Sequence, residues 1–267
     1  MLSMLTLLSG SVDATETLRS AIVLQEHAGA ELLVAHPDPI SGLADTMAAP
    51  EGMVTDVHME AIGEAAQQAR RAFTRICGEN ARCRYKPFAA APQDVLRKQA
   101  LFADLCVLAR DYGLIGTDMR LLKSALVDSR IPTVLLPRDV MRAPPATVVC
   151  AWNGQAASAR AIRAAIPFIA KASRVLVLEH AGNEVNRSRL EHFLALHGVA
   201  AAEWRPYGDE ALTARGRARA LLAEAKRCGG DFLVMGAYGE ARERFFQFGR
   251  ATEKVAEAAR IPVLFCH

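Results

Sequence analysis

Three segments of the first half of this chain recur in the second half, in the same order. Each match is short, but an ordered succession favours a duplicated domain over chance. The chain has 267 residues, which is enough for two domains of ordinary size. The sequence therefore predicts two similar domains in tandem. The matching pairs are residues 30–36 with 173–180, 103–109 with 230–236, and 129–136 with 259–265.

The joint between the two copies is residues 137–146, a segment rich in proline and charge that is typical of a surface linker. We expect domains at residues 1–138 and 146–267. The first half carries one extra stretch, residues 36–56, with many Pro, Gly and Ala residues. Because it is long for a connection, we expect a loop that serves as a flap or a packing arm before a helix at residues 57–77.

Apolar runs alternate with helical patterns in both halves. The runs are continuous, which indicates strands buried on both faces. Strands that alternate with helices form a parallel sheet with helices on both sides, so the sequence predicts an α/β doubly wound fold. In the first half we expect strands near residues 3–9, 30–35, 82–88, 104–109 and 132–136. In the second half we expect strands at 147–152, 174–179, 200–206, 231–235 and 262–266, and helices at 155–171, 186–197, 210–228 and 250–259.

Composition argues against several classes of protein. The net charge is only +3 and no run of Lys and Arg forms a basic tail, so nothing indicates nucleic acid as a partner. The apolar start, residues 1–8, has no positive leader or cleavage pattern, and we expect a strand there. No apolar stretch approaches the ~20 residues that span a bilayer, so no membrane is expected. None of the six cysteines forms a C-x-x-C pair, and we expect buried thiols in a cytoplasmic protein.

A glycine motif follows the apolar run at residues 231–235. Gly236 and Gly239 let the backbone turn sharply and approach a ligand closely. Gly249 precedes a predicted helix, whose free amides and dipole suit a phosphate. Thr252 can offer a hydroxyl near that phosphate. The motif therefore predicts a place to hold a nucleotide.

Arg250 stands where a small hydroxyl residue would fit most easily beside a phosphate. Its guanidinium can bind the phosphate through two hydrogen bonds, fill the phosphate site or point to solvent. Arg242, Arg244 and Lys254 lie nearby in the sequence and make the region positive. That charge suits either an anionic ligand or an exposed charged helix face.

Ligands of doubly wound sheets bind outside the carboxyl ends of the strands, where the strand order reverses. Loops after two further strands of the second half would meet the glycine loop there. Asn153 can hydrogen-bond a ribose hydroxyl or an adenine edge, or it can serve as a helix cap or turn residue. Trp152 can stack on a base or simply pack, and Leu178 and Glu179 can offer main-chain groups or form an ordinary strand end. The sequence has neither a Gly-x-Ser-x-Gly elbow nor a P-loop, so no constellation indicates catalysis.

The spacing Gly236-x2-Gly239-x9-Gly249-x2-Thr252, followed by residues 261–264 with the sequence Ile-Pro-Val-Leu, resembles the universal stress protein (UspA-like) family. The whole chain resembles the tandem form of that family. The resemblance implies two tandem doubly wound five-stranded parallel-sheet domains of strand order 3-2-1-4-5, Rossmann-like and adenine nucleotide alpha hydrolase-like. Members that keep the motif bind ATP or a related adenine nucleotide, often with Mg²⁺.

By position, the resemblance implies one nucleotide site, in the second half. Asn153 replaces the family's usual acid, and Arg250 replaces its usual serine. In the first half Ala109 stands where Gly236 stands in the second, and the glycine spacing is missing, so we expect no nucleotide there. Carried over by position, Trp152, Asn153 and Gly154 line the ribose and phosphate side, Glu179 or Leu178 lies against adenine, and Met235, Gly236, Gly239, Gly249, Arg250 and Ala251 surround ribose and phosphates.

The family also pairs domains through the edges of their fifth strands. The resemblance therefore implies that residues 133–136 and 263–266 pair the two halves within one chain, and it allows a homodimer. We expect a protein that binds and signals in the stress response and is not an enzyme, with slow ATP hydrolysis at most. The alternative is a tandem scaffold that binds no nucleotide and acts through protein–protein contacts. An enzyme on a related doubly wound fold is a third interpretation.

Overall fold

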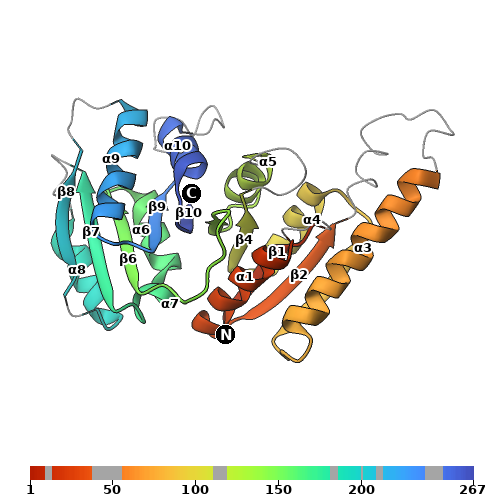
Figure 1. Cartoon of the computed structure of the whole chain (residues 1–267). Coiled ribbons are helices and arrows are strands. Elements are labelled where there is room, and N and C mark those ends of the chain that lie inside the picture. The colour runs from red at the N-terminus through yellow and green to blue at the C-terminus, as the bar shows by residue number, and fades with distance from the viewer. Residues whose placement is uncertain are drawn as a thin grey trace. The chain divides into compact units, whose positions relative to one another are not determined.

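Both halves of the computed structural model repeat the same alternation of strands and helices (Figure 1). The structure describes residues 1–9, 14–37, 56–110, 119–180, 186–199, 201–208, 213–237 and 249–267, with only the backbone for residues 56–62 and 180. The chain divides into two compact units, Met1–Ile131 with Arg138–Arg142 (unit 1) and Pro132–Pro137 with Ala143–His267 (unit 2). The predicted domain limits, 1–138 and 146–267, stay a proposal.

Unit 1 is a parallel sheet packed against helices. Its strands pair in the order β3-β2-β1-β4. Helix α1 packs against α3, the long helix of this unit (Figure 1). The elements are β1 (Ser3–Leu7), α1 (Ala14–Ala28), β2 (Glu31–Pro37), α3 (Asp56–Cys77), β3 (Cys83–Phe88), α4 (Pro92–Gln99), a 3₁₀ turn (Ala100–Phe102), β4 (Leu105–Ala109), α5 (Met119–Lys123) and a π-helical turn (Ser124–Asp128).

Unit 2 repeats this plan. Its own strands are parallel, in the order β8-β7-β6-β9-β10. Helix α6 packs against β9 and β10, and α9 packs against α10. The elements are β6 (Thr147–Trp152), α6 (Ala156–Ala164), α7 (Ile166–Ile169), β7 (Arg174–His180), α8 (Arg187–Leu196), β8 (Glu203–Tyr207), α9 (Ala214–Arg227), β9 (Phe232–Gly236), α10 (Arg250–Ala258) and β10 (Val263–Cys266).

Unit 2 also contains β5 (Thr133–Leu136), the last strand of the first half of the sequence, which pairs antiparallel with β10. Numbered along each half of the chain, the strand order is 3-2-1-4-5 in both. The predicted α/β doubly wound fold with this order is therefore confirmed.

Burial follows the position of each strand in its sheet. The inner strands β1, β4, β6 and β9 are almost wholly buried, as their continuous apolar runs predict. The outermost strands β3 and β8 are largely exposed, so the prediction of burial on both faces is wrong for these two. Each carries charged residues and one proline, Pro87 or Pro206. Because proline has no N–H to donate, it suits an open sheet edge and discourages further pairing.

Two local predictions need correction. The helix expected at residues 155–171 is interrupted at Ala165, between α6 and α7. Pro167 lies in the first turn of α7, and proline both lacks an N–H and clashes with the carbonyl four residues earlier, so it cannot continue α6. His36 and Pro37, expected in the loop 36–56, belong to β2, and residues 38–55 lie outside the described residues. The other predicted strands, and the helices, differ from the structure mainly at their ends.

All six cysteines are buried free thiols, which confirms the prediction for them. No helix within the described ranges is both long and apolar enough to cross a membrane. The same ranges contain no group of three His, Cys, Asp or Glu side chains that could hold a metal ion.

Candidate functional site

Three neighbouring strands of unit 2 carry part of the predicted site at their carboxyl ends. Strand β6 lies between β7 and β9, and Trp152 at its end is directly opposite Glu179 of β7. Gly236 ends β9, as Ala109 ends β4 in unit 1. The side chains of Trp152, Leu178 and Met235 are buried, so Leu178 can offer a ligand only its main chain. The structure therefore brings these residues to one edge of the sheet.

Asn153 shapes the turn that leads from β6 into α6. Its Oδ1 accepts hydrogen bonds from the backbone N–H of Gln155 (3.1 Å) and from the hydroxyl of Ser158 (2.8 Å). Its Nδ2 donates to Oε1 of Gln155 at 3.2 Å. Gly154, between them, adopts a positive φ of 72°, which favours glycine. Asn153 thus has the turn-forming role that was one of its two predicted roles, and a ribose hydroxyl would compete for the same oxygen.

Gly236 is a glycine because β9 and α6 approach each other closely. A Cβ at this position would lie 2.7 Å from the backbone nitrogen of Ser158, 2.8 Å from the carbonyl carbon of Ala157 and 2.9 Å from the Ala157 Cβ. Real Cβ atoms do not approach other atoms so closely, and two of these three are backbone atoms that cannot rotate away. The first glycine of the motif therefore has a packing role, which holds whether or not a ligand binds.

The start of α10 keeps the features that suit an anion. Gly249 is its N-cap residue and has no side chain, so the first amides of the helix receive no cap oxygen from it. Arg250, the first residue of the helix, is exposed, and Ala251 is half-buried. The side chain of Thr252 is only 3% exposed, which places its hydroxyl inside the unit. Gly239, Arg242 and Arg244 lie outside the described residues.

A cavity of about 250 Å³ opens beside the end of β6, between α6 and α8. It shares Trp152 and Gly154 with the predicted site, and its other lining residues are new. Ala156 and Ala159 form one apolar wall, while Arg163 and Arg189 add positive charge. Such a cavity suits a small ligand with an apolar body and a negative group. The remaining lining residues are Gln155, Asn186, Leu190 and Phe193.

The sequence contained part of the signal for this cavity. Ala156, Ala159 and Arg163 follow helical spacing, as do Asn186, Leu190 and Phe193. Each set therefore predicts one helix face. The pairing of these two faces depends on how α6 and α8 pack, which spacing along one helix does not specify.

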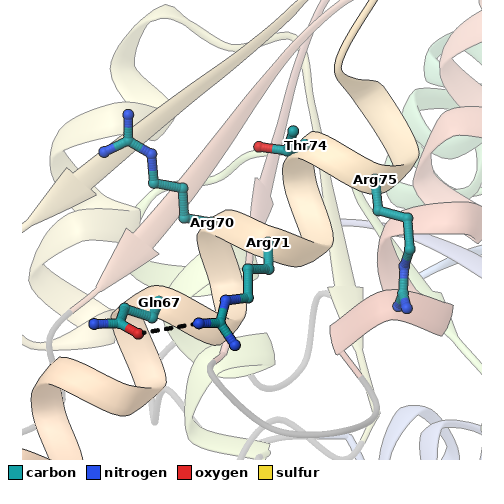
Figure 2. Close-up of a pocket in the computed structure, with 5 residues that line it drawn as sticks. All are labelled: Gln67, Arg70, Arg71, Thr74 and Arg75. Carbon is teal, nitrogen blue, oxygen red and sulfur yellow. Dashed lines mark hydrogen bonds between the residues drawn. The ribbon is translucent and has the colours of Figure 1, made fainter.

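Unit 1 has a larger hollow of about 500 Å³ along α3, lined by Gln67, Arg70, Arg71, Thr74 and Arg75 (Figure 2). Arg71 donates a hydrogen bond to Oε1 of Gln67 at 3.4 Å. Arg75 donates to the hydroxyl of Thr15, on α1, at 2.8 Å. The described lining comes from one helix, so these residues form a solvated basic face.

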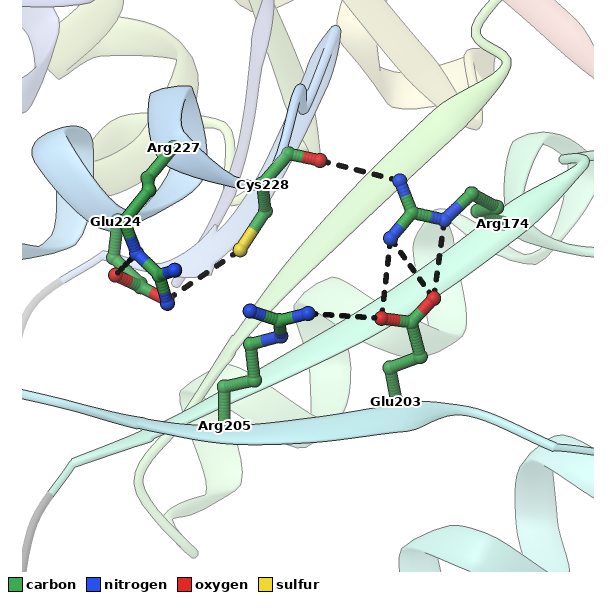
Figure 3. Close-up of polar contacts among 6 residues, drawn as sticks. All are labelled: Arg174, Glu203, Arg205, Glu224, Arg227 and Cys228. Carbon is green, nitrogen blue, oxygen red and sulfur yellow. Dashed lines mark hydrogen bonds and ion pairs between the residues drawn. The ribbon is translucent and has the colours of Figure 1, made fainter.

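A polar cluster lies at the opposite end of the unit 2 sheet, where β7 and β8 begin (Figure 3). Arg174 binds both carboxylate oxygens of Glu203, at 2.9 and 3.1 Å from Nη2, and also donates to the carbonyl of Cys228 at 3.3 Å. Hydrogen bonds from Arg174, with a further one from Arg205, hold the pKa of the Glu203 carboxyl below its usual range. The cluster ties the outer strand β8 to β7 and to the end of α9, so its role is structural.

The comparisons with known proteins agree with this fold. No family model matches the sequence, and no curated protein does. A universal stress protein from Archaeoglobus fulgidus DSM 4304 superposes with a TM-score of 0.69, covering 99% of this chain and 97% of that chain at 15% identity. Over its whole length, the chain has the universal stress protein fold. The functionally unknown protein PA1789 from Pseudomonas aeruginosa PAO1 also matches, with a TM-score of 0.57, 15% identity and coverage of 99% and 92%.

Identity at this level establishes the fold and leaves the site to the residues themselves. The tandem architecture implied by the glycine motif and the duplicated segments agrees with the full-length match to a universal stress protein. The nucleotide contacts implied by the same resemblance stay a prediction.

Proposed function

We propose that this chain is a universal-stress-type binding protein that holds an adenine nucleotide at the carboxyl edge of β6, β7 and β9 and acts in the stress response without turning over a substrate. The observation that carries the proposal is the start of α10. Gly249 leaves the first amides of this helix without a side-chain cap, and the exposed cation Arg250 stands beside them. Amides and a guanidinium together form a binding place for phosphate oxygens.

Each predicted residue has a part in this proposal. Arg250 and the amides of α10 bind the phosphates, and Mg²⁺ accompanies them when ATP is the ligand. The main chain of Leu178 and the neighbouring Glu179 lie against the base. The side chain of Trp152 is 4% exposed, so it packs inside the unit behind the site and does not stack on the base. The buried free thiols suit a reducing compartment, and on that ground we propose the cytoplasm.

Titration calorimetry with ATP, ADP, AMP and adenosine, with and without Mg²⁺, tests the proposal. If Arg250 contacts phosphate, Arg250→Ala removes a charge-assisted hydrogen bond of about 1.5–3 kcal/mol. ATP should then bind about 10- to 100-fold more weakly, while adenosine affinity stays unchanged. Arg260→Ala is the matched control, since Arg260 is also exposed and follows the far end of the same helix. Absence of binding heat for all nucleotides at millimolar concentration would refute the proposal.

A tandem scaffold without nucleotide is the second candidate, and two observations favour it. The amide of Asn153 is engaged in the turn before α6, and the packing of α6 requires Gly236 to be glycine. Neither residue therefore needs a ligand to explain it. Arg250→Ser discriminates further: if the arginine fills the phosphate site, this variant gains ATP binding that the parent protein lacks. The antiparallel pairing of β5 with β10 supports the related proposal that the two halves pair through their fifth strands.

A further inference from the structure

The cleft of about 250 Å³ between α6 and α8 lies on the outer side of α6. This helix presents two different faces to its surroundings. One face packs into the core of unit 2 with its buried residues, Ser158, Ala161 and Ile162. The other face lines the cleft with exposed residues at helical spacing, Ala156, Ala159 and Arg163. The cleft is therefore open to a ligand from solvent, and the packing of α6 does not fill it.

The opposite wall of the cleft comes from α8. Leu190 and Phe193 line it, the first buried and the second half-buried. The Phe193 ring makes an edge contact with His197, one turn later, with the ring centroids 4.7 Å apart and an interplanar angle of 61°. That contact favours one orientation of the Phe193 ring. With small alanines on one side and an oriented aromatic ring on the other, the cleft suits a ligand with a flat apolar body.

Two arginines give the cleft a positive charge. Arg163 of α6 and Arg189 of α8 both line it, and the described lining contains no Asp or Glu. Glu191 of α8 is already paired with Arg187, at 3.2 Å. Within the described ranges, no ion pair joins Arg163 or Arg189 to an acidic side chain. Because a guanidinium matches the geometry of a carboxylate, this charge favours a carboxylate as the negative group of the ligand.

The start of α8 adds to the attraction for an anion. Asn186, its N-cap residue, lines the cleft and has a left-handed backbone conformation, with a φ of 64°. Its side chain makes no cap hydrogen bond, so the first amides of α8 receive no oxygen from it. These amides and the positive end of the helix dipole stabilise a negative charge nearby. Arg189 lies in the same first turn of α8, so both effects favour a negative group at this end of the cleft.

We propose that this cleft is a binding site for a small aromatic carboxylate. The ring of the ligand lies against Ala159 and Phe193, and its carboxylate lies between the guanidiniums of Arg163 and Arg189. The volume of about 250 Å³ is below the range of about 300–1,000 Å³ for sites of drug-sized ligands, so the occupant is smaller than ATP. The proposal goes beyond the nucleotide function, because the phosphates of a nucleotide are assigned to the start of α10.

An NMR titration of the full chain with benzoate, at constant ionic strength and without nucleotide, tests this site independently of the nucleotide proposal. We expect a dissociation constant of about 1–10 mM, as befits so small a ligand, and shifts of the backbone amide signals of Gly154 and Arg189. Acetate has the charge without the ring, and benzamide has the ring without the charge. Each should bind at least about 10-fold more weakly than benzoate. Equal binding of either compound, or no shift of these two signals well above that benzoate concentration, would show the assignment to be wrong.

Matched variants locate the ligand in the cleft. Arg163→Gln should weaken benzoate binding about 10-fold, because it removes a charge-assisted hydrogen bond. Arg160→Gln, an exposed position of the same helix outside the described lining, should leave it unchanged. Ala159→Leu should fill the cleft and abolish binding at unchanged charge, whereas Ala195→Leu, an exposed position of α8 outside that lining, should not. The site is refuted if Arg163→Gln and Ala159→Leu both bind benzoate as the parent protein does.

Discussion

The packing role assigned to Gly236 predicts a large effect of the smallest possible change, Gly236→Ala. The added Cβ would lie 2.7 Å from the Ser158 nitrogen and 2.8 Å from the Ala157 carbonyl carbon, so either α6 or the end of β9 must shift. Overpacking of this kind costs about 1–3 kcal/mol. We expect the upper end of that range, because both atoms belong to the backbone of a helix that also packs against β10.

Tryptophan fluorescence measures this loss in unit 2 alone. The chain has two tryptophans, Trp152 and Trp204, and both belong to unit 2. With a urea m-value of about 2 kcal/mol/M, a loss of about 3 kcal/mol lowers the urea midpoint by about 1.5 M.

Gly249→Ala is the matched control within the same motif. A Cβ at Gly249 meets only Oγ1 of Thr252, at 3.6 Å, which is ordinary contact, and the φ of −60° suits any residue. An N-cap position prefers glycine to alanine only modestly. The free energy of unfolding of this variant should therefore fall by no more than about 0.5–1 kcal/mol. Equal urea midpoints for Gly236→Ala and the parent protein would refute the close approach of β9 to α6.

Two further predictions concern a glycine and an ion pair. Gly63→Ala should stabilise unit 1 by about 0.5–1 kcal/mol, because Gly63 lies exposed inside α3 and a Cβ there meets nothing within 4 Å; a lower urea midpoint by circular dichroism would contradict this. The Glu203 carboxyl should titrate below its usual pKa of about 4.3 in a carbon NMR titration, and Arg174→Gln should raise that pKa. Since the pKa is depressed in the folded state, this interaction stabilises the protein above the unfolded-state pKa and is lost as the pH falls through the folded-state pKa. Equal values in both proteins would rule out Arg174 as the cause.

The sequence predicts this fold well because the signals for it are local. Each inner strand is a short continuous apolar run, and the repeated order of segments requires both halves to share one topology. The outer strands β3 and β8 do not have such an apolar run. Each contains charged residues and a proline, so its pattern reflects an open sheet edge. Pro167 predicts the break in the helix expected at 155–171. Its missing N–H ends one helix, and its fixed φ suits the start of the next.

The candidate site was less predictable, because one residue type serves two purposes. A glycine after a strand can admit a ligand or a neighbouring helix, and only the position of α6 shows that Gly236 admits Ala157 and Ser158. An asparagine after a strand can bind a ligand or form a turn, and only the contacts to Gln155 and Ser158 reveal the turn. Such distinctions depend on tertiary packing, which spacing along the chain does not encode.

These contacts also decide which residues are free to act on a phosphate. Thr252, the last residue of the motif, is 3% exposed and its Oγ1 lies toward Gly249, so it supports the start of α10 from inside. Arg250 is exposed at the first position of the same helix. A serine at that position would contact a phosphate through a short neutral hydrogen bond. A guanidinium reaches further and carries charge, so the site proposed here should favour ligands with more than one phosphate over AMP and should weaken as salt concentration rises.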